Sequence, residues 1–341
     1  MPTTIHDVAR RLNLSITTIS RALDGYDDVA DATRQRVLQV AREMGYVPSR
    51  AARQLRRNRA DALGYILPTH DPRFTDPFFA EFMAGLGDEA AAHNLDLLVS
   101  TAPPGEEAER QLYARWVHGR RVDGLVLSRM RRQDWRTEFL AARGLPFVCL
   151  GRADASADHV WIEADARAGF AALVAHLASL GHRRIAYVGA PADLALQADR
   201  HGGYCDGLAA AGLPIDPDLV TEGDLTRRGG QAAARRLLAL PNPPSAILAA
   251  NDLTAIGVMR AAQECGLVLG RDLAVAGYDG IEAGEHTQPA LTTLSVPVYD
   301  MARRLAAMLV CLIAGERLDP SQVMLQPELV IRDSSGGPRS D

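Results

Sequence analysis

The chain has 341 residues, enough for two or three domains, and its hydrophobic content of 47% is sufficient to bury a sizeable core. The formal net charge of −5 argues against nucleic-acid binding, yet residues 1–59 hold 11 Arg against 6 Asp and Glu and so carry +5, leaving −10 for the remainder. Lys is absent, which excludes a Schiff-base lysine, a pyridoxal-phosphate site and a Walker A loop.

The four Cys are far apart and form no CxxC pair, so we expect small buried side chains in a reducing cytosol rather than disulfides or a metal site. We expect no cofactor. The first 13 residues contain no apolar run, and no stretch of 18 uninterrupted apolar residues occurs. These features predict a cytoplasmic protein without a signal peptide or a membrane span.

Residues 1–46 are predicted to form three short helices. The first is marked by apolar side chains at helical spacing, namely Ile5, Val8, Ala9 and Leu12. Ser15 is a good N-cap for a second helix over residues 16–23. A third helix is expected over residues 32–44, ending at Gly45. Two short helices joined by a tight turn form a helix-turn-helix, whose second helix fits a major groove.

The second helix has a polar outer side that carries an arginine. Its outward residues are expected to be Ile16, Thr17, Ser20 and Arg21. Arg21 could make a bidentate contact to a guanine, while hydroxyls and backbone N–H groups at the helix start hold phosphates. A small helical bundle with an ordinary charged face remains the alternative. Three acidic residues follow the helix, Asp24, Asp27 and Asp28, so either that loop sits back from the phosphates or DNA binding is weakened.

Residues 47–60 are basic, rich in small residues, and carry one large aliphatic side chain, Leu55. A segment of about two helical turns is unstable alone. We therefore predict a short hinge that folds against DNA, with Leu55 inserted between base steps of the minor groove. A solvated Arg-rich linker explains the composition equally well.

From residue 61 onward, short apolar runs alternate with Ala-rich amphipathic stretches. The runs cover residues 62–67, 95–100, 124–127, 147–150, 185–188, 246–249 and 273–276. This order predicts a doubly wound α/β fold with parallel sheets. Ligands of such sheets bind outside the carboxyl ends of the strands.

Polar and aromatic residues follow several of these runs, including Phe79, Arg152, Arg200, Asn251 and Asp279. Arginines and carboxylates that fork onto neighbouring hydroxyls, with an aromatic ring under an apolar face, suit a sugar. Each residue also has a structural interpretation: Asn251 could cap a helix, Asp279 could lie in a turn and Phe79 could belong to the core.

The motifs described above resemble the lactose/galactose repressor family. The matching blocks are residues 4–9, 14–23, 33–37 and 45–49, and, further along, 76–79, 181–186, 250–252, 277–279 and 291–294. The resemblance covers nearly the whole chain. It implies an N-terminal all-α helix-turn-helix domain, a two-lobed periplasmic-binding-protein-like sensor, and a homodimer on a pseudo-palindromic operator in double-stranded DNA.

The resemblance also implies roles for individual residues. The base-reading positions are Ile16, Thr17 and Arg21. The phosphate contacts are Ser15, Thr18 and Ser20. The hinge contacts to the minor groove are Ala52 and Leu55. The effector contacts are Phe79, Arg152, Asp165, Arg200, Leu225, Asn251 and Asp279.

We expect a DNA-binding domain over residues 1–46, a hinge over 47–60, and an effector-binding and dimerisation domain over 61–341. Its first lobe would take residues 61–162 and 291–320, and its second 163–290 and 321–333. The tail lacks leucine heptads, which favours a dimer over a tetramer.

The function predicted is a nucleoid-associated transcriptional repressor of sugar-utilisation genes, controlled by a small sugar-like effector. The alternative is a nucleobase or another metabolite acting as co-repressor. An enzyme is disfavoured, because no GxGxxG follows a strand and neither GxSxG nor HExxH occurs. A transport binding protein and an architectural DNA-binding protein without an effector are the other rivals.

Overall fold

The computed structural model describes residues 3–46, 59–68, 76–102, 104–153 and 159–336. By internal contacts the chain divides into two compact units, residues 1–60 and residues 61–341. Each unit is described by itself. Among the described residues, no helix has the length and apolar character needed to cross a bilayer.

The N-terminal unit is a bundle of α1 (Ile5–Leu12), α2 (Ile16–Leu23) and α3 (Asp31–Glu43). Each helix contributes one fully buried side chain to its centre, Val8, Ile19 and Val37. The start of α1 is a capping box, in which the Thr4 backbone N–H and hydroxyl both donate to the Asp7 carboxylate at 3.0 and 2.7 Å. Local capping and one apolar stripe per helix therefore suffice to define this small unit.

The C-terminal unit is built on two sheets of six strands among the described residues. The first sheet has the order β11-β5-β4-β3-β1-β2 and is parallel throughout. Its strands are β1 (Ala62–Leu67), β2 (Asp96–Thr101), β3 (Gly124–Leu127), β4 (Phe147–Leu150), β5 (Val160–Ala164) and β11 (Gln322–Leu325).

The second sheet has the order β12-β10-β9-β8-β6-β7 and is parallel except for β12. Its strands are β6 (Ile185–Gly189), β7 (Val220–Glu222), β8 (Ala246–Ala249), β9 (Ala274–Asp279), β10 (Thr292–Ser295) and β12 (Glu328–Val330). The predicted doubly wound α/β class is confirmed.

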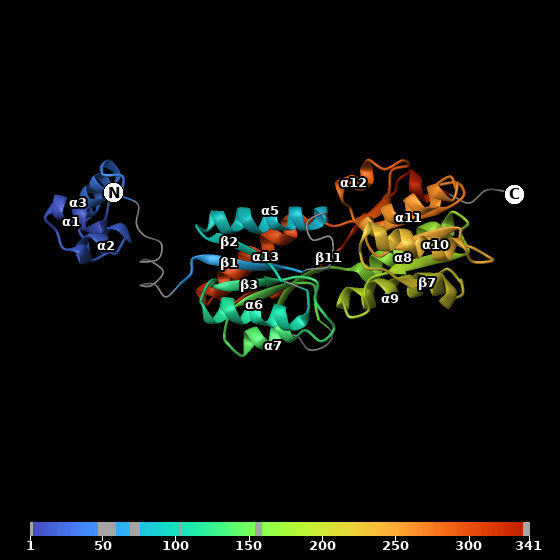
Figure 1. Ribbon diagram of the computed structural model, residues 1–341, viewed down its shortest axis with the longest axis horizontal. Coiled ribbons are helices and arrows are strands. Elements are labelled where there is room, and N and C mark those ends of the chain that lie inside the picture. The colour runs from blue at the N-terminus through green and yellow to red at the C-terminus, as the bar shows by residue number, and fades with distance from the viewer. Residues whose placement is uncertain (1–2, 47–58, 69–75, 103, 154–158, 337–341) are drawn as a thin grey trace. The chain divides into compact units, whose positions relative to one another are not determined.

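Helices cover both faces of each sheet (Figure 1). Lobe one holds α5 (Pro77–Ala92), α6 (Glu106–His118), α7 (Trp135–Ala141) and α13 (Val298–Ala314), with α5 and α13 packed together. Lobe two holds α8 (Ala166–Ser179), α9 (Ala195–Ala210), α10 (Arg227–Leu238), α11 (Asp252–Glu264) and α12 (Glu282–Glu285). Short 3-10 turns lie at Pro217–Leu219 and Asp333–Ser335.

The buried strands of lobe two show why a continuous apolar run predicts a sheet covered twice. In β6, Ile185 and Tyr187 belong to the core shared with α8 and α9, while Ala186 and Val188 belong to the core shared with α10 and α11. Successive side chains of a strand point to opposite faces, so every position must be apolar when both faces are covered.

The chain passes between the lobes three times in the described residues, at Asp165, at residues 296–297 and at residues 326–327. These crossovers differ from the predicted lobe bounds. β10 lies in the second sheet, although residues 291–320 were assigned to lobe one, and β11 lies in the first, although residues 321–333 were assigned to lobe two. The reason is pairing: β10 extends the sheet beside β9, and β11 lies beside β5, so each crossover occurs after a strand.

Candidate functional site

The start of α2 presents the hydroxyl groups of Ser15 and Thr17 at the surface. Ser15 Oγ accepts a hydrogen bond from Thr18 N at 3.0 Å and lies 2.8 Å from Thr18 Oγ1. Ile16 is 42% exposed, and Thr17 is exposed beside it. An aliphatic side chain held in water at the beginning of a polar helix face is suited to contact with base edges and thymine methyl groups.

Arg21 lies one turn further along α2 and is also exposed. Its Nε donates to Asp28 Oδ1 at 3.1 Å, its Nη2 is paired with Asp28 Oδ2, and its guanidinium lies 5.1 Å from the centre of the Tyr26 ring. Ser20 differs from the prediction. It is 6% exposed and donates to Asp24 Oδ2 at 3.4 Å, because it follows the buried Ile19 and lies at the edge of the apolar stripe. The Ser20 side chain is therefore less exposed than expected, and its phosphate contact stays a prediction.

The predicted hinge residues Ala52 and Leu55 lie outside the described residues, and their roles stay predictions.

A pocket lies between the two lobes of residues 61–341, at the carboxyl ends of strands from both sheets. Its volume is about 120 Å³. It is lined by Asp76, Phe78, Phe79, Ser128, Arg129, Met130, Leu150, Gly151, Arg152, Glu163, Ala164, Ala166, Leu196, Arg200, Leu225, Asn251, Tyr278, Asp279, Val296 and Met301. A larger groove, of about 1160 Å³, borders α6 and α7 in lobe one. We favour the smaller pocket as the ligand site, because the carboxyl ends of strands from both sheets meet there together with buried charged side chains.

Arg200 on α9 is the buried cation of this pocket. It is 9% exposed, its Nη1 donates to the Ala250 carbonyl at 2.5 Å, and its guanidinium lies 4.2 Å from the centre of the Tyr278 ring. Arg200 Nε is buried and has no hydrogen-bond partner in the described part of the chain. A buried donor without a partner is costly unless a ligand or water accepts its proton.

Asp279 and Asn251 stand beside this arginine, at the ends of β9 and β8. Asp279 is 7% exposed; burial raises the pKa of its carboxyl well above the usual value, and the nearby Arg200 opposes that shift. Asn251 caps α11, accepting from Thr254 N at 3.1 Å and from Thr254 Oγ1 at 2.6 Å, and donates to the Leu225 carbonyl at 3.3 Å. Capping and lining the pocket are thus compatible roles for Asn251.

Asp252, at the start of α11, stabilises the part of lobe two that carries Asn251 and Asp279. It is fully buried and accepts from Gly280 N and Ile281 N, each at 2.9 Å, and from Thr293 Oγ1 at 2.6 Å. Burial raises the pKa of its carboxyl to about 7, against the effect of these donors. The carboxylate therefore ties α11, β9 and β10 together around Asn251 and Asp279.

Lobe one supplies the other charged groups. Arg152 Nε donates to Glu163 Oε2 at 2.6 Å, and its Nη2 donates to Asp199 Oδ2, on α9 of lobe two, at 3.1 Å. Arg129 and Asp76 form a second pair, with Nη2 3.4 Å from Oδ2. The pocket thus contains three arginines and three carboxylates, which together can form charge-assisted hydrogen bonds to a ligand with many hydroxyls.

Aromatic and apolar side chains complete the lining. Phe79 on α5 is 5% exposed, and the Arg129 guanidinium lies 5.0 Å from the centre of its ring. Leu225 lines the opposite lobe with a left-handed backbone (φ 63°). Asp165 is the predicted effector residue that the structure leaves out of the lining. It lies at a crossover and caps α8, with its Oδ1 accepting from Ala168 N at 2.9 Å.

Comparison with known proteins identifies both units. Residues 4–49 match the model for bacterial regulatory proteins of the lacI family, and residues 174–335 match that for a periplasmic binding protein-like domain. The HTH-type transcriptional regulator CelR of Thermobifida fusca is 33% identical over 334 residues, which cover 97% of this chain and 98% of CelR. This chain is a LacI-family transcriptional regulator.

Solved structures of LacI-family regulators have the same fold. A CelR–cellobiose complex superposes with a TM-score of 0.76 at 31% identity, over 97% of this chain and 99% of that one. A lac repressor dimer bound to operator and the anti-inducer ONPF superposes with a TM-score of 0.86 at 27% identity, over 99% and 100% of the two chains. The predicted family and the predicted two-part fold are therefore confirmed, and the members of this family are DNA-binding regulators.

Sequence reasoning missed three charged residues of the regulator's pocket: Asp76, Arg129 and Glu163. Arg129 follows β3 by two residues, so the same strand-end argument that selected Arg152 would have found it. Asp76 stands in the motif block at residues 76–79, from which the family resemblance implies only Phe79 as a contact. Glu163 lies inside β5, a strand that the sequence pattern did not reveal.

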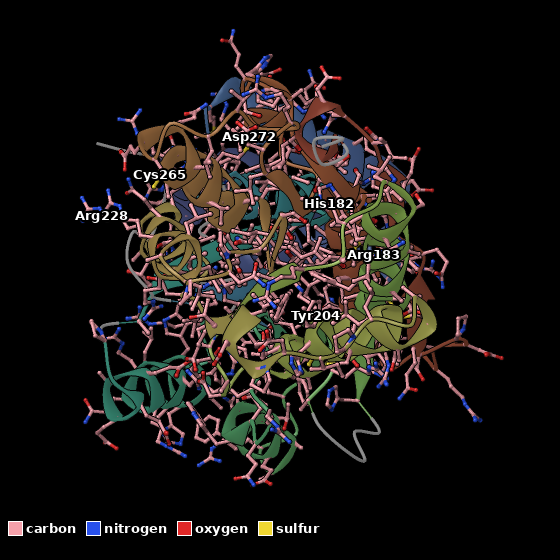
Figure 2. All side chains as sticks on the ribbon, turned by 90° about the vertical axis from the view of Figure 1, so that its right-hand side faces the viewer. His182, Arg183, Tyr204, Arg228, Cys265 and Asp272 are labelled. Carbon is pink, nitrogen blue, oxygen red and sulfur yellow. The ribbon has the colours of Figure 1, made fainter. Side chains whose placement is uncertain are left out.

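The motif at residues 181–186 serves the fold and not the pocket. His182 is 1% exposed, with Nδ1 3.0 Å from Ser245 Oγ and Nε2 2.9 Å from the Gly336 carbonyl. His182 precedes β6 and therefore lies at the amino ends of the strands, on the opposite side of the sheet from the pocket. Figure 2 labels it beside Arg183.

Glu163 makes the stability of the regulator depend on pH. Burial raises the pKa of its carboxyl from 4.5 to about 7, against the lowering effect of Arg152. Because the folded-state pKa exceeds the unfolded value, the stability that Glu163 contributes is complete below pH 4.5 and is lost as the pH rises through about 7. Glu163→Gln, which does not titrate, should therefore gain thermal stability relative to the wild type over this window, by at most about 3 kcal/mol.

The measurement is the melting temperature of both proteins by tryptophan fluorescence at several pH values from about 5 to about 8. All three Trp of the chain lie in residues 61–341, so this signal reports that unit. Glu328→Gln, at an exposed position on β12, is the control and should follow the wild type. A constant difference between the Glu163→Gln and wild-type curves would contradict the assignment.

Proposed function

We propose that this LacI-family regulator is a repressor of sugar-utilisation genes whose operator affinity is set by a carbohydrate bound in the pocket between the lobes. The observation that carries this proposal is Arg200, which lines the pocket with Asn251 and Asp279 and whose buried Nε has no hydrogen-bond partner among the described residues. Paired arginines and carboxylates bind neighbouring hydroxyls, and the Phe79 ring can lie under an apolar sugar face. The cellobiose complex of CelR supports the same ligand class.

In this proposal Ile16, Thr17 and Arg21 read bases, and Ser15 and Thr18 contact phosphates. The protein acts as a homodimer on a pseudo-palindromic operator, which the likeness to the dimeric lac repressor supports. It works in the cytoplasm, in association with the nucleoid. No chemical turnover is assigned to the pocket.

The proposed switch links the pocket to DNA through residues 47–60. Effector binding changes the relative position of the lobes and the spacing of the two hinge segments in the dimer. Ala52 and Leu55 then make or lose their minor-groove contacts. Such control requires the effector to bind one of two states more tightly, because equal affinity for both shifts nothing.

The test begins with a thermal-shift panel of mono- and disaccharides, with nucleosides and nucleobases included. We expect at least one carbohydrate to raise the melting temperature and to change operator affinity, measured by fluorescence anisotropy on an operator selected from random duplexes. In a Leu55→Ala variant, operator affinity should fall while the carbohydrate-induced thermal shift stays the same. Stabilisation by a nucleobase alone, or conversion of any sugar into a product, would contradict the proposal.

A further inference from the structure

The carboxylate of Asp28 holds the side chain of Arg21, the residue of α2 to which we assign base reading. Asp28 lies between α2 and α3 and contacts the Nε–Nη2 edge of the Arg21 guanidinium through both of its oxygens. The Tyr26 ring lies against the same guanidinium. Arg21 is therefore held on two sides although its side chain is 45% exposed.

Asp28 is itself presented by an ordered turn. Arg34 on α3 donates from Nη2 to the Tyr26 carbonyl at 2.8 Å and to the Val29 carbonyl at 3.3 Å. Val29 N donates to the Tyr26 carbonyl at 3.2 Å, and the Val29 side chain is 8% exposed in the core of the unit. The turn is thus anchored on either side of Asp28, so the carboxylate faces Arg21 as a consequence of the fold.

The contact leaves free the edge of the guanidinium that a guanine needs. An arginine carries five N–H donors, and Asp28 occupies Nε and one proton of Nη2. Three donors remain, at the Nη1–Nη2 end, and a bidentate contact to guanine O6 and N7 uses two of them. The carboxylate and the base therefore need not compete for the same protons.

We propose that Asp28 is a positioning residue for base recognition, which restricts Arg21 to the orientation that offers its outer edge to a guanine. The inference rests on the proposed role of Arg21. It also explains why acidic residues are tolerated on a DNA-facing surface. A negative charge lowers the affinity for phosphates at every sequence, whereas an ordered arginine raises discrimination at one base pair.

The test compares full-length Asp28→Ala with Asp27→Ala. Asp27 is exposed and adjacent, and no ion pair joins it to Arg21 in the described structure, so its replacement removes the same charge without touching the arginine. Binding is measured for three duplexes: the selected operator, the operator with the guanine opposite Arg21 changed to adenine, and an unrelated sequence. Arg21→Ala identifies that guanine as the base pair at which discrimination is lost.

We expect Asp28→Ala to reduce the guanine-to-adenine affinity ratio at least about fivefold, while binding to the unrelated duplex is unchanged or tighter. Asp27→Ala should preserve the ratio, and Asp28→Glu, which keeps a carboxylate, should retain more discrimination than Asp28→Ala. The inference is overturned if Asp28→Ala strengthens all three duplexes by the same factor as Asp27→Ala, or leaves the ratio intact. If Arg21→Ala alters discrimination nowhere, the base-reading assignment itself fails, which is a separate result.

Discussion

Replacing Arg200 with alanine should weaken carbohydrate binding by at least about 10-fold, because a hydrogen bond made by a charged group contributes about 1.5–3 kcal/mol. Arg200 is buried, and its Nε has no hydrogen-bond acceptor among the described residues. Its guanidinium contacts the Ala250 carbonyl and the Tyr278 ring. Its loss also removes the positive charge that most opposes the effect of burial on the pKa of Asp279.

The measurement is isothermal titration of the best carbohydrate from the panel into the wild type and the variant. Arg167→Ala is the matched control, because Arg167 lies on the surface of the same lobe and is paired with Asp206 at 2.6 Å. Arg200→Lys should be intermediate, since lysine retains the charge but not the fork of donors. Equal affinities for wild type and Arg200→Ala would place the ligand elsewhere.

Replacing Arg136 with alanine should have the largest effect on stability, a loss of about 3–5 kcal/mol. Arg136 is 2% exposed, and its Nε and Nη2 donate to the two oxygens of Asp134 at 2.8 and 2.5 Å. Burial acts to raise the pKa of Asp134, but the hydrogen bonds and charge of Arg136 outweigh it, and the pKa lies below the usual value. Without the Arg136 side chain this buried carboxylate loses its ion-pair partner and keeps only backbone donors, and a cavity remains.

Arg136 also supports the pocket. Its Nη2 donates to the carbonyls of Ser128 and Arg129 at 3.2 Å each, and Arg129 is held in a left-handed conformation (φ 46°) with its side chain in the lining. Arg136→Ala should thus lower carbohydrate affinity even at temperatures where the protein is folded.

Stability is followed by circular dichroism during heating, where a loss of this size corresponds to a melting temperature lower by roughly 6–20 °C. Arg143→Ala, at an exposed position just beyond α7, should change it by at most a degree or two, roughly the shift expected from a surface substitution. A variant as stable as the wild type would show that water replaces the arginine around Asp134.

Much of this regulator was predictable because the signals are local. Ser15 caps α2 where expected, and β1, β3, β4 and β8 coincide with apolar runs, since a strand covered on both faces needs an apolar side chain at every position. The short strands β7, β10, β11 and β12 escaped prediction because three or four residues with polar members give no distinct pattern.

The strand-end rule predicts from the sequence that Arg152, Arg200, Asn251 and Asp279 meet in one cleft, and all four line the pocket. The rule could not show which of them are buried, since burial depends on helices that pack from distant parts of the chain. Ser20 illustrates the limit within a single helix. The pattern placed its side chain on the outer side of α2, whereas in the three-helix bundle Ser20 is only 6% exposed.

What the sequence by itself determined was the class of each element and the family, because periodicity, caps and motif spacing are properties of neighbouring residues. Only the tertiary structure decided the partners: Glu163 with Arg152, Asp134 with Arg136, and Asp28 with Arg21. Charges attract over several ångströms in any direction, so the pairs that form depend on where the crossovers and turns place each side chain, and chain spacing alone does not specify this.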